Sequence, residues 1–179
     1  MRLAGALAVA VLVCAGTATA ATPVGVVREI MEAAPGKMPG ELRCISRQEL
    51  LRKARPMLRA AGRTVHAGLS GLTFVRAGHM VVLLDGNRVC RPLYRYVTQG
   101  GVPFGTIVDA LAAVLHEKAH AQGIRTEWKA SCWAIRPTLS QGRRWGWTAK
   151  ELSEVKHYLA FYLDGWVPEE YKLYGRCRV

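Results

Sequence analysis

Beyond its first twenty residues, the chain has no apolar run approaching the roughly 18 to 20 residues that a membrane-spanning helix needs. It has no C-x-x-C pair, which argues against a zinc site built from cysteines. It also lacks internal repeats and low-complexity tracts, and acidic residues are scarce, with 13 Asp and Glu against 25 Lys and Arg. These absences argue against a membrane-spanning protein, a cysteine-ligated zinc protein and a repeat array.

The first twenty residues have the pattern of a secretory signal peptide. Met1-Arg2 supplies a short positive start, Leu3 to Val13 is an apolar core, and Ala18-Thr19-Ala20 is a small-x-small cleavage site. We therefore expect residues 1–20 to be removed and the protein to be secreted.

The remaining segment, residues 21–179, is long enough for one domain with its own core. A rival interpretation of the N-terminus makes Cys14 a lipid-attachment site. The bulky Val13 directly before that cysteine argues against lipid anchoring.

Four cysteines follow the expected cleavage site, namely Cys44, Cys90, Cys132 and Cys177. An even number in an exported chain indicates disulfides, here two. Three pairings are possible. We favour Cys44–Cys90 with Cys132–Cys177, in which Cys177 would pin the C-terminal tail to the body of the domain.

The basic excess is concentrated in two places. Loss of residues 1–20 removes only Arg2 and changes the formal net charge from +12 to +11. Many basic residues lie in RQELLRKARPMLRAAGR, at positions 47–63, and Arg143-Arg144 stands beside two tryptophans. Such clusters fit an anionic partner such as a cell-wall polymer, or simply a solvated helix face. No nucleic-acid-binding motif accompanies the charge, which argues against nucleic acid as the partner.

Hydrophobic periodicity and turn residues predict a single α+β domain, with a small β-hairpin or sheet packed on several helices. Two capping boxes, Ser46 with Glu49 and Thr148 with Glu151, mark helix starts. The expected helices are Pro23–Ala34, Arg47 to about Ala61 with a bend or break at Pro56, Val89–Thr98, one capped by Thr106 and ended by Gly123, one from near Arg125 to Ile135 that stops at or before Pro137, and one from Thr148 to about Leu163. The expected strands are Leu72–Val75 and Met80–Leu84, and the tail after the last helix is expected to be irregular.

The segment AVLHEKAHAQGIRTEW carries the strongest functional signal. Its residues His116, Glu117 and His120 fit the pattern H-E-x-x-H on the best-defined helix. Positions i and i+4 share one helix face, so both imidazoles can reach one zinc ion. Zinc lowers the pKa of a bound water molecule, and Glu117 stands where it can take that water's proton.

Glu127 is the favoured third ligand. In a continuous helix it would lie about 10 Å beyond His120, too far to share an ion. Gly123 can end the helix and turn the chain back, so that Glu127 enters from the next helix. Alternatively, Glu127 is only a first-turn carboxylate that favours the helix dipole. The other candidates for the third ligand, His157, Glu151 and Glu154, all lie on the last long helix.

The motif resembles the active-site helix of the zincin metallopeptidases. The longer pattern H-E-x-x-H-x-x-G-x-x-x-E, with a cysteine five residues on, resembles small secreted zinc metallopeptidases of actinobacteria, specifically between Val114 and Ala134. Metzincins carry a histidine where this chain has Thr126, which puts membership of that subgroup in doubt.

The resemblance implies that His116 and His120 bind zinc, that Glu117 is the general base and that Glu127 is the third ligand. It also implies an extended strand beside the helix along which a peptide substrate pairs. Met80–Leu84 is the candidate, and the same run can equally be a buried core strand. A group that stabilises the oxyanion should complete the site, and the available side chains are His157, Tyr158, Tyr162 and Tyr171.

We therefore expect a secreted zinc-dependent metallopeptidase that hydrolyses peptide bonds of a peptide or protein substrate by a water molecule that Zn²⁺ binds and Glu117 activates. The alternative is a non-catalytic, basic cell-wall or surface-binding protein whose metal is structural. A weaker alternative is a zinc amidase that acts on wall peptides.

Overall fold

The computed structural model describes residues 22–65, 68–161 and 177, and within them the fold is α+β, as predicted. The expected signal peptide, Cys14, Tyr162, Tyr171 and the irregular tail lie outside the described residues, apart from Cys177. The elements, in chain order, are α1 (Pro23–Ala33), β1 (Glu41–Ile45), α2 (Arg47–Ala60), β2 (Gly71–Arg76), β3 (His79–Asp85), the π-helical turn η1 (Gly86–Cys90), α3 (Arg91–Thr98), α4 (Phe104–Ala121), α5 (Glu127–Arg144) and α6 (Ala149–Phe161).

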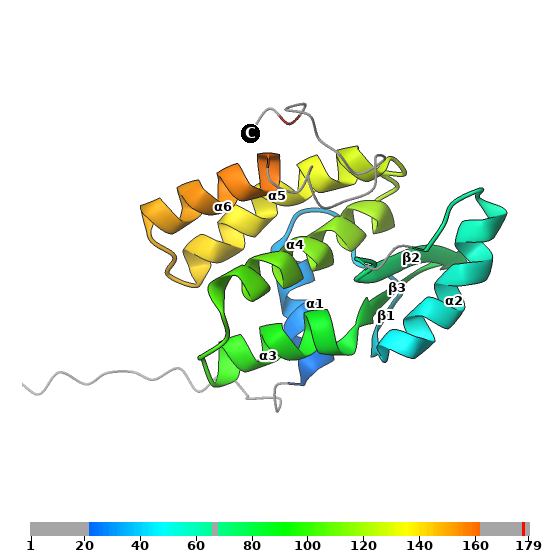
Figure 1. Cartoon of the computed structure of the whole chain (residues 1–179), viewed down its shortest axis with the longest axis horizontal. Coiled ribbons are helices and arrows are strands. Elements are labelled where there is room, and N and C mark those ends of the chain that lie inside the picture. The colour runs from blue at the N-terminus through cyan, green and yellow to red at the C-terminus, as the bar shows by residue number, and fades with distance from the viewer. Residues whose placement is uncertain (1–21, 66–67, 162–176, 178–179) are drawn as a thin grey trace, which may run out of the picture.

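The three described strands form one sheet in the order β1-β3-β2, with helices on both faces (Figure 1). β3 pairs in parallel with β1 and antiparallel with β2. Successive strand residues point to opposite faces. Accordingly, Val82 and Leu84 pack into the large core formed by α1 and α3 to α6, whereas Val81 and Leu83 pack against α2.

The turn between β2 and β3 confirms the predicted hairpin. Ala77 and Gly78 have positive φ angles of 48° and 80°. A two-residue turn of this kind matches the right-handed twist of paired strands. β2 therefore lies on the outer side of β3, beside α4 (Figure 1).

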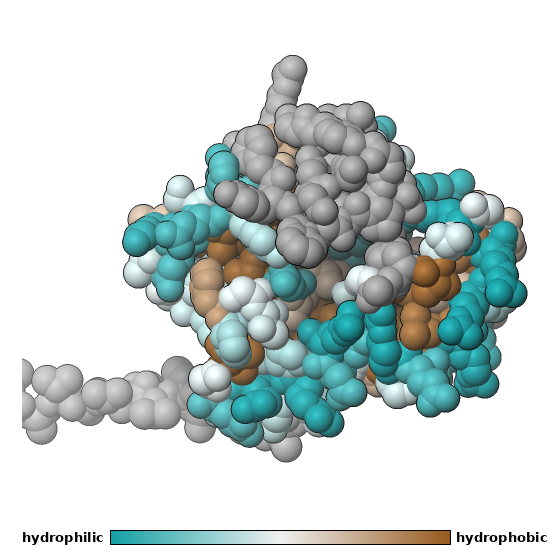
Figure 2. Space-filling model, in the orientation of Figure 1, coloured by the Kyte–Doolittle hydropathy of each residue, from teal (hydrophilic) through white to brown (hydrophobic). Residues whose placement is uncertain are grey.

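α2 covers the outer face of the sheet with a narrow apolar stripe. Leu50 and Ala54 are buried there, and Ser46 caps the helix by accepting the backbone N–H of Glu49 at 3.2 Å. The helix continues through Pro56, an exposed position, so it is not split there, the second of the two predicted possibilities. Hydrophilic residues line the edge of the molecule that α2 forms (Figure 2).

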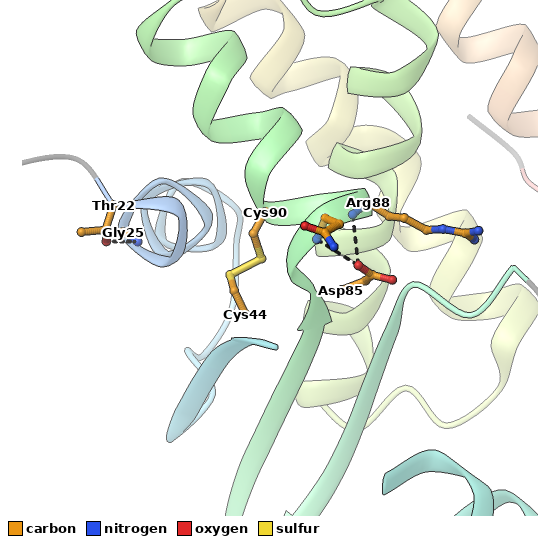
Figure 3. Close-up of a disulfide and its surroundings, with 7 residues drawn as sticks. Thr22, Gly25, Cys44, Asp85, Arg88 and Cys90 are labelled. Carbon is orange, nitrogen blue, oxygen red and sulfur yellow. Dashed lines mark hydrogen bonds between the residues drawn. A yellow bond between two sulfur atoms is a disulfide. The ribbon is translucent and has the colours of Figure 1, made fainter. Parts of the chain in front are cut away.

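Both favoured disulfides are present. Cys44 at the end of β1 is bonded to Cys90 at the end of η1 (Figure 3), and Cys132 on α5 is bonded to Cys177. Beside the first bridge, Oδ1 of the buried Asp85 accepts the backbone N–H groups of Asn87 and Arg88 at 3.0 and 3.1 Å, which fixes the turn into η1. Disulfides of this kind are compatible with an exported protein.

No helix in the described part of the chain is long and apolar enough to cross a membrane.

Two predicted boundaries were wrong, and one strand was missed. α5 does not stop at Pro137 but runs to Arg144, because Pro137 and Gly142 are buried in tertiary contacts that override local propensity. α4 begins at Phe104, two residues before the predicted cap. β1 was not predicted at all, since its partner β3 lies about forty residues away in the sequence.

The expected substrate strand was also misplaced. Met80–Leu84 lies within β3, which is paired on both sides and has no free edge for a peptide. Among the described strands, the open edge on the side of α4 belongs to β2.

Candidate metal centre

The end of α4 brings the chain back on itself as the sequence predicted. Gly123 has a φ of 92°, a left-handed conformation that glycine adopts without steric cost. The N–H of Gly123 bonds to the carbonyl of His120 at 2.9 Å, and that of Ile124 to the carbonyl of Ala119 at 3.2 Å. This is a Schellman motif. It reverses the chain so that Glu127 becomes the first residue of α5.

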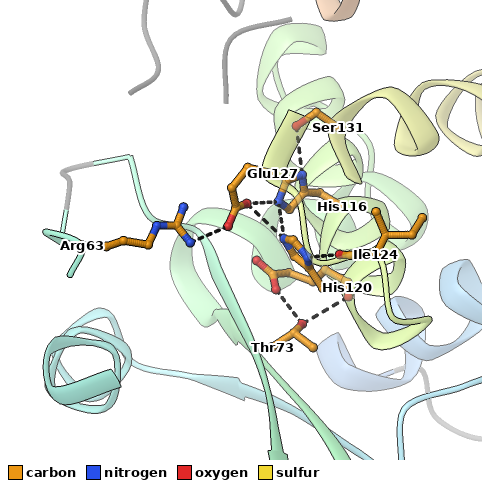
Figure 4. Close-up of polar contacts among 8 residues, drawn as sticks. Arg63, Thr73, His116, His120, Ile124, Glu127 and Ser131 are labelled. Carbon is orange, nitrogen blue, oxygen red and sulfur yellow. Dashed lines mark hydrogen bonds and ion pairs between the residues drawn. The ribbon is translucent and has the colours of Figure 1, made fainter. Parts of the chain in front are cut away.

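Three potential ligand atoms converge at this reversal (Figure 4). Nε2 of His116 and Nε2 of His120 lie 2.9 Å apart, and Oε2 of Glu127 lies 3.0 and 3.1 Å from them. All three side chains are largely buried, with 11 to 14% of their surface exposed. The structure thus brings together the three residues that the sequence named as metal ligands.

The outer nitrogen of each imidazole has a partner of its own. Nδ1 of His120 lies 2.6 Å from the carbonyl oxygen of Ile124, and Nδ1 of His116 lies 3.1 Å from Oγ of Ser131. A carbonyl can only accept, so Nδ1 of His120 carries the hydrogen and Nε2 of the neutral ring presents a lone pair to the centre. Such outer contacts orient histidine ligands in metal sites.

The second carboxylate oxygen of Glu127 is also held. Oε1 accepts a hydrogen bond from Nη1 of Arg63 at 2.8 Å. The arginine therefore fixes the carboxylate plane and leaves Oε2 facing the two histidines (Figure 4).

Charge is concentrated at the centre. Burial alone would raise the pKa of Glu127, but hydrogen bonds with His116 and His120 lower it far below its usual range. For His120, burial lowers the pKa, but the hydrogen bond with Glu127 and the charge of Glu117 raise it above its ordinary value.

The donor set fits a zinc ion. Around tetrahedral zinc with bonds of roughly 2.0 to 2.1 Å, neighbouring ligand atoms lie about 3.3 Å apart. The three observed separations are within a few tenths of an ångström of that spacing. Two imidazole nitrogens and one carboxylate oxygen are also a common protein contribution to catalytic zinc. His116, His120 and Glu127 could therefore hold the ion and leave a fourth position open.

Glu117 lies beside this centre, where β2 provides both a hydrogen bond and room for its side chain. Its Oε2 accepts a hydrogen bond from Oγ1 of Thr73 on β2 at 2.6 Å. Gly71 on the same strand leaves room for the side chain, since a Cβ there would stand 2.4 Å from Cγ of Glu117. Burial raises the pKa of Glu117, against the opposing effects of the two histidine charges and the Thr73 hydrogen bond.

A cleft of about 640 Å³ opens beside these residues. His116 and Glu117 line one end of it, and the start of β2 contributes Gly71. Of the three potential ligands, His116 therefore borders a space large enough for a molecule larger than water, and so does Glu117.

The rival third ligands do not reach the centre. Glu151 caps α6 by accepting the N–H of Thr148 at 2.7 Å, as the capping box predicted. Glu154 and His157 are exposed on the same helix, outside the group of converging ligand atoms. Of the side chains considered for the oxyanion, Tyr158 lines the cleft, whereas His157 lies outside that cleft.

Sequence reasoning did not find Ser131, Thr73, Arg63 or Gly71. Two signals were available. Ser131 follows Glu127 by four residues and so shares its helix face, and Gly71 and Thr73 alternate on one face of their strand. No local signal links Arg63 to Glu127, which is 64 residues away.

No protein-family model matches the chain, and neither a curated protein nor a solved structure matches it significantly.

Proposed function

We propose that the chain is a secreted zinc-dependent metallopeptidase. The observation that carries this proposal is the convergence of His116, His120 and Glu127 on one point, with the buried carboxylate of Glu117 beside it and an open cleft in front. The resemblance of the H-E-x-x-H helix to that of zincins supports the same function.

His116, His120 and Glu127 would hold the ion, with Ile124, Ser131 and Arg63 fixing their orientations. Bound zinc supplies a Lewis acid that acidifies a water molecule and polarises a peptide carbonyl. Where metzincins have a histidine this chain has Thr126, and the adjacent Glu127 provides the third donor instead.

Glu117 takes the proton from the attacking water. Oε2 is occupied by Thr73, and no hydrogen bond from the described residues reaches Oε1, so Oε1 is the atom that accepts the proton. After attack, the same carboxyl group can return the proton to the departing amine.

The open edge of β2 supports a peptide as the substrate. An extended peptide can add to an exposed strand edge through backbone hydrogen bonds, whatever its side chains. β2 runs beside α4, and Gly71 at its start lines the cleft next to Glu117.

The test is turnover of a peptide library by zinc-loaded wild type and Glu117→Gln. The substitution keeps the size of the side chain and removes its ability to accept a proton. We expect it to keep zinc and fold while losing roughly 10²-fold or more in rate, the usual scale for a removed acid–base group. Glu154→Gln, an exposed change, is the matched control. Equal turnover in Glu117→Gln and wild type would show that the proposed mechanism is wrong.

A second candidate function is non-catalytic binding of an anionic wall polymer. The basic residues of α2 support it. Arg52, Arg55 and Arg59 are exposed and share one helix face. None forms an ion pair with an acidic residue in the described ranges. Salt-sensitive binding to an anionic polymer, without any hydrolysis that depends on Glu117, would favour this candidate.

A further inference from the structure

The cleft continues well beyond the metal centre. It follows α4 from His116 and Glu117 to Asp109 and Tyr158. Asp109 precedes His116 by seven residues, or two helical turns, which places it about 10 Å further along the same helix face. Asp109 lies on α4 and Tyr158 on α6, so the far end is built by two helices.

The wall between the two ends is apolar and made largely of small side chains. Ala112 and Ala113 on α4 line the cleft together with Ile135 on α5 and Leu159 on α6. Alanines keep the channel open, and their methyl groups suit contact with a chain of methylene groups rather than with a polar one.

The far end carries a carboxylate that is already oriented. Oδ1 of Asp109 accepts the hydroxyl hydrogen of Tyr158 at 2.9 Å, which leaves Oδ2 for another donor. Although the chain holds 25 Lys and Arg, none in the described ranges forms an ion pair with Asp109. Arg88 also lines the cleft. Asp109 is exposed at this end of the cleft, and desolvation by the residues around it raises the pKa of its carboxyl group.

We propose that this end of the cleft is a subsite for a basic side chain of the substrate, lysine or arginine, with Asp109 as the residue that determines specificity. The aliphatic stem lies along Ala112 and Ala113, and the cationic head reaches Oδ2 of Asp109. Long basic side chains suit this arrangement because their stems are apolar and only their tips are charged. The inference deepens the proposed function and rests on it, since the subsite adjoins the proposed catalytic centre.

The experiment measures binding separately from turnover. N-acetyl-lysine amide and N-acetyl-norleucine amide are titrated into the mature chain carrying Glu117→Gln, and dissociation constants are read from NMR chemical shifts. The two probes share the aliphatic stem and differ in the charge. We expect the lysine amide to bind at least about tenfold more tightly, the scale of one charge-assisted hydrogen bond.

Two variants separate charge from structure. Asp109→Asn keeps a group that can accept from Tyr158 but removes the charge, and should bring the two affinities within about twofold. Tyr158→Phe removes the hydrogen bond but keeps the charge, and should retain most of the preference. Equal binding of the two amides to the starting protein, no binding of the lysine amide, or a preference that survives Asp109→Asn would each overturn the inference.

A parallel arm keeps this result distinct from the proposed function. Zinc-loaded wild type and Asp109→Asn are given the same peptide library, and the residues flanking each cleaved bond are compared. Cleavage without a basic preference overturns the subsite and leaves the peptidase proposal in place. Absence of cleavage, together with tighter binding of the lysine amide, overturns the peptidase proposal and sustains a site for basic side chains.

Discussion

The two faces of a single turn of α4 do different work. His116, Glu117 and His120 face α5 and β2, where they meet Glu127, Ser131 and Thr73 (Figure 4). Of the two intervening residues, both fully buried, Lys118 points away from this face towards the end of α1. The pattern H-E-x-x-H sets no chemical requirement at its two middle positions. In this chain one of them, Lys118, holds the helix in place.

Lys118 provides that anchor. Its Nζ donates hydrogen bonds to the carbonyl oxygens of Met31 and Ala34, the latter at 2.7 Å, at the C-terminal end of α1. The Met31 carbonyl otherwise accepts only the N–H of Ala34, at 3.2 Å, and a cation at this helix end also complements the helix dipole. Burial lowers the pKa of Lys118, and the charge of Glu32 opposes that effect. Within one helical turn, Lys118 thus anchors α4 to α1 and thereby fixes the position of the reactive side chains.

The largest expected effect comes from breaking the anchor. Lys118→Met keeps the apolar stem but leaves the Ala34 carbonyl without its donor and the Met31 carbonyl with the Ala34 N–H alone, so the free energy of unfolding should fall by about 1–3 kcal/mol. Urea denaturation of wild type, Lys118→Met and the exposed control Lys150→Met measures the change. The folded fraction of Lys118→Met should still bind zinc, because its histidines are untouched. Equal stability of the two methionine variants would refute the anchoring role.

A smaller effect, on zinc affinity, should follow when His116 loses the contact between its Nδ1 and Ser131. Ser131→Ala removes the contact with Nδ1 of His116, and zinc affinity should fall by about 10- to 100-fold with little change in stability. Ser140→Ala, an exposed change on the same helix, is the matched control. Competition with a chromophoric chelator gives both affinities, and an unchanged affinity in Ser131→Ala would mean that the serine does not orient the ring.

The smallest effect should come from the partner of the general base. Thr73→Val preserves shape but removes the donor to Oε2 of Glu117, so turnover should fall by about tenfold, the worth of one hydrogen bond to a charged group. Zinc affinity should stay at the wild-type value, with Thr64→Val as the exposed control. A loss of zinc in Thr73→Val would place the threonine in metal binding instead.

The reactive face of this turn depends mostly on local features, which the sequence could predict. The histidine pair and the turn at Gly123 follow from spacing and from one residue's backbone conformation, so they are visible locally. The capping box of Thr148 and Glu151 is local as well, and the structure confirms it.

Contacts that join distant segments could not be predicted. In the sequence, Lys118 is indistinguishable from an ordinary helical lysine, because its hydrogen-bond partners at the end of α1 lie 84 to 87 residues earlier in the chain. β1 pairs with a strand that follows only after another helix and strand, and α5 passes through Pro137 because the surrounding core holds it. In each case, tertiary packing determined a structure that local propensity either disfavoured or did not specify.

The central claim is that His116, His120 and Glu127 together hold one zinc ion. The most direct measurement is the zinc content of the mature chain, purified at neutral pH without a chelator, beside that of His116→Ala and Glu127→Ala. We expect one zinc per wild-type chain, almost none in His116→Ala, and clearly weakened binding in Glu127→Ala, because catalytic zinc usually needs three protein ligands. Zinc near zero in the wild type, or held as tightly in Glu127→Ala as in the wild type, would contradict it.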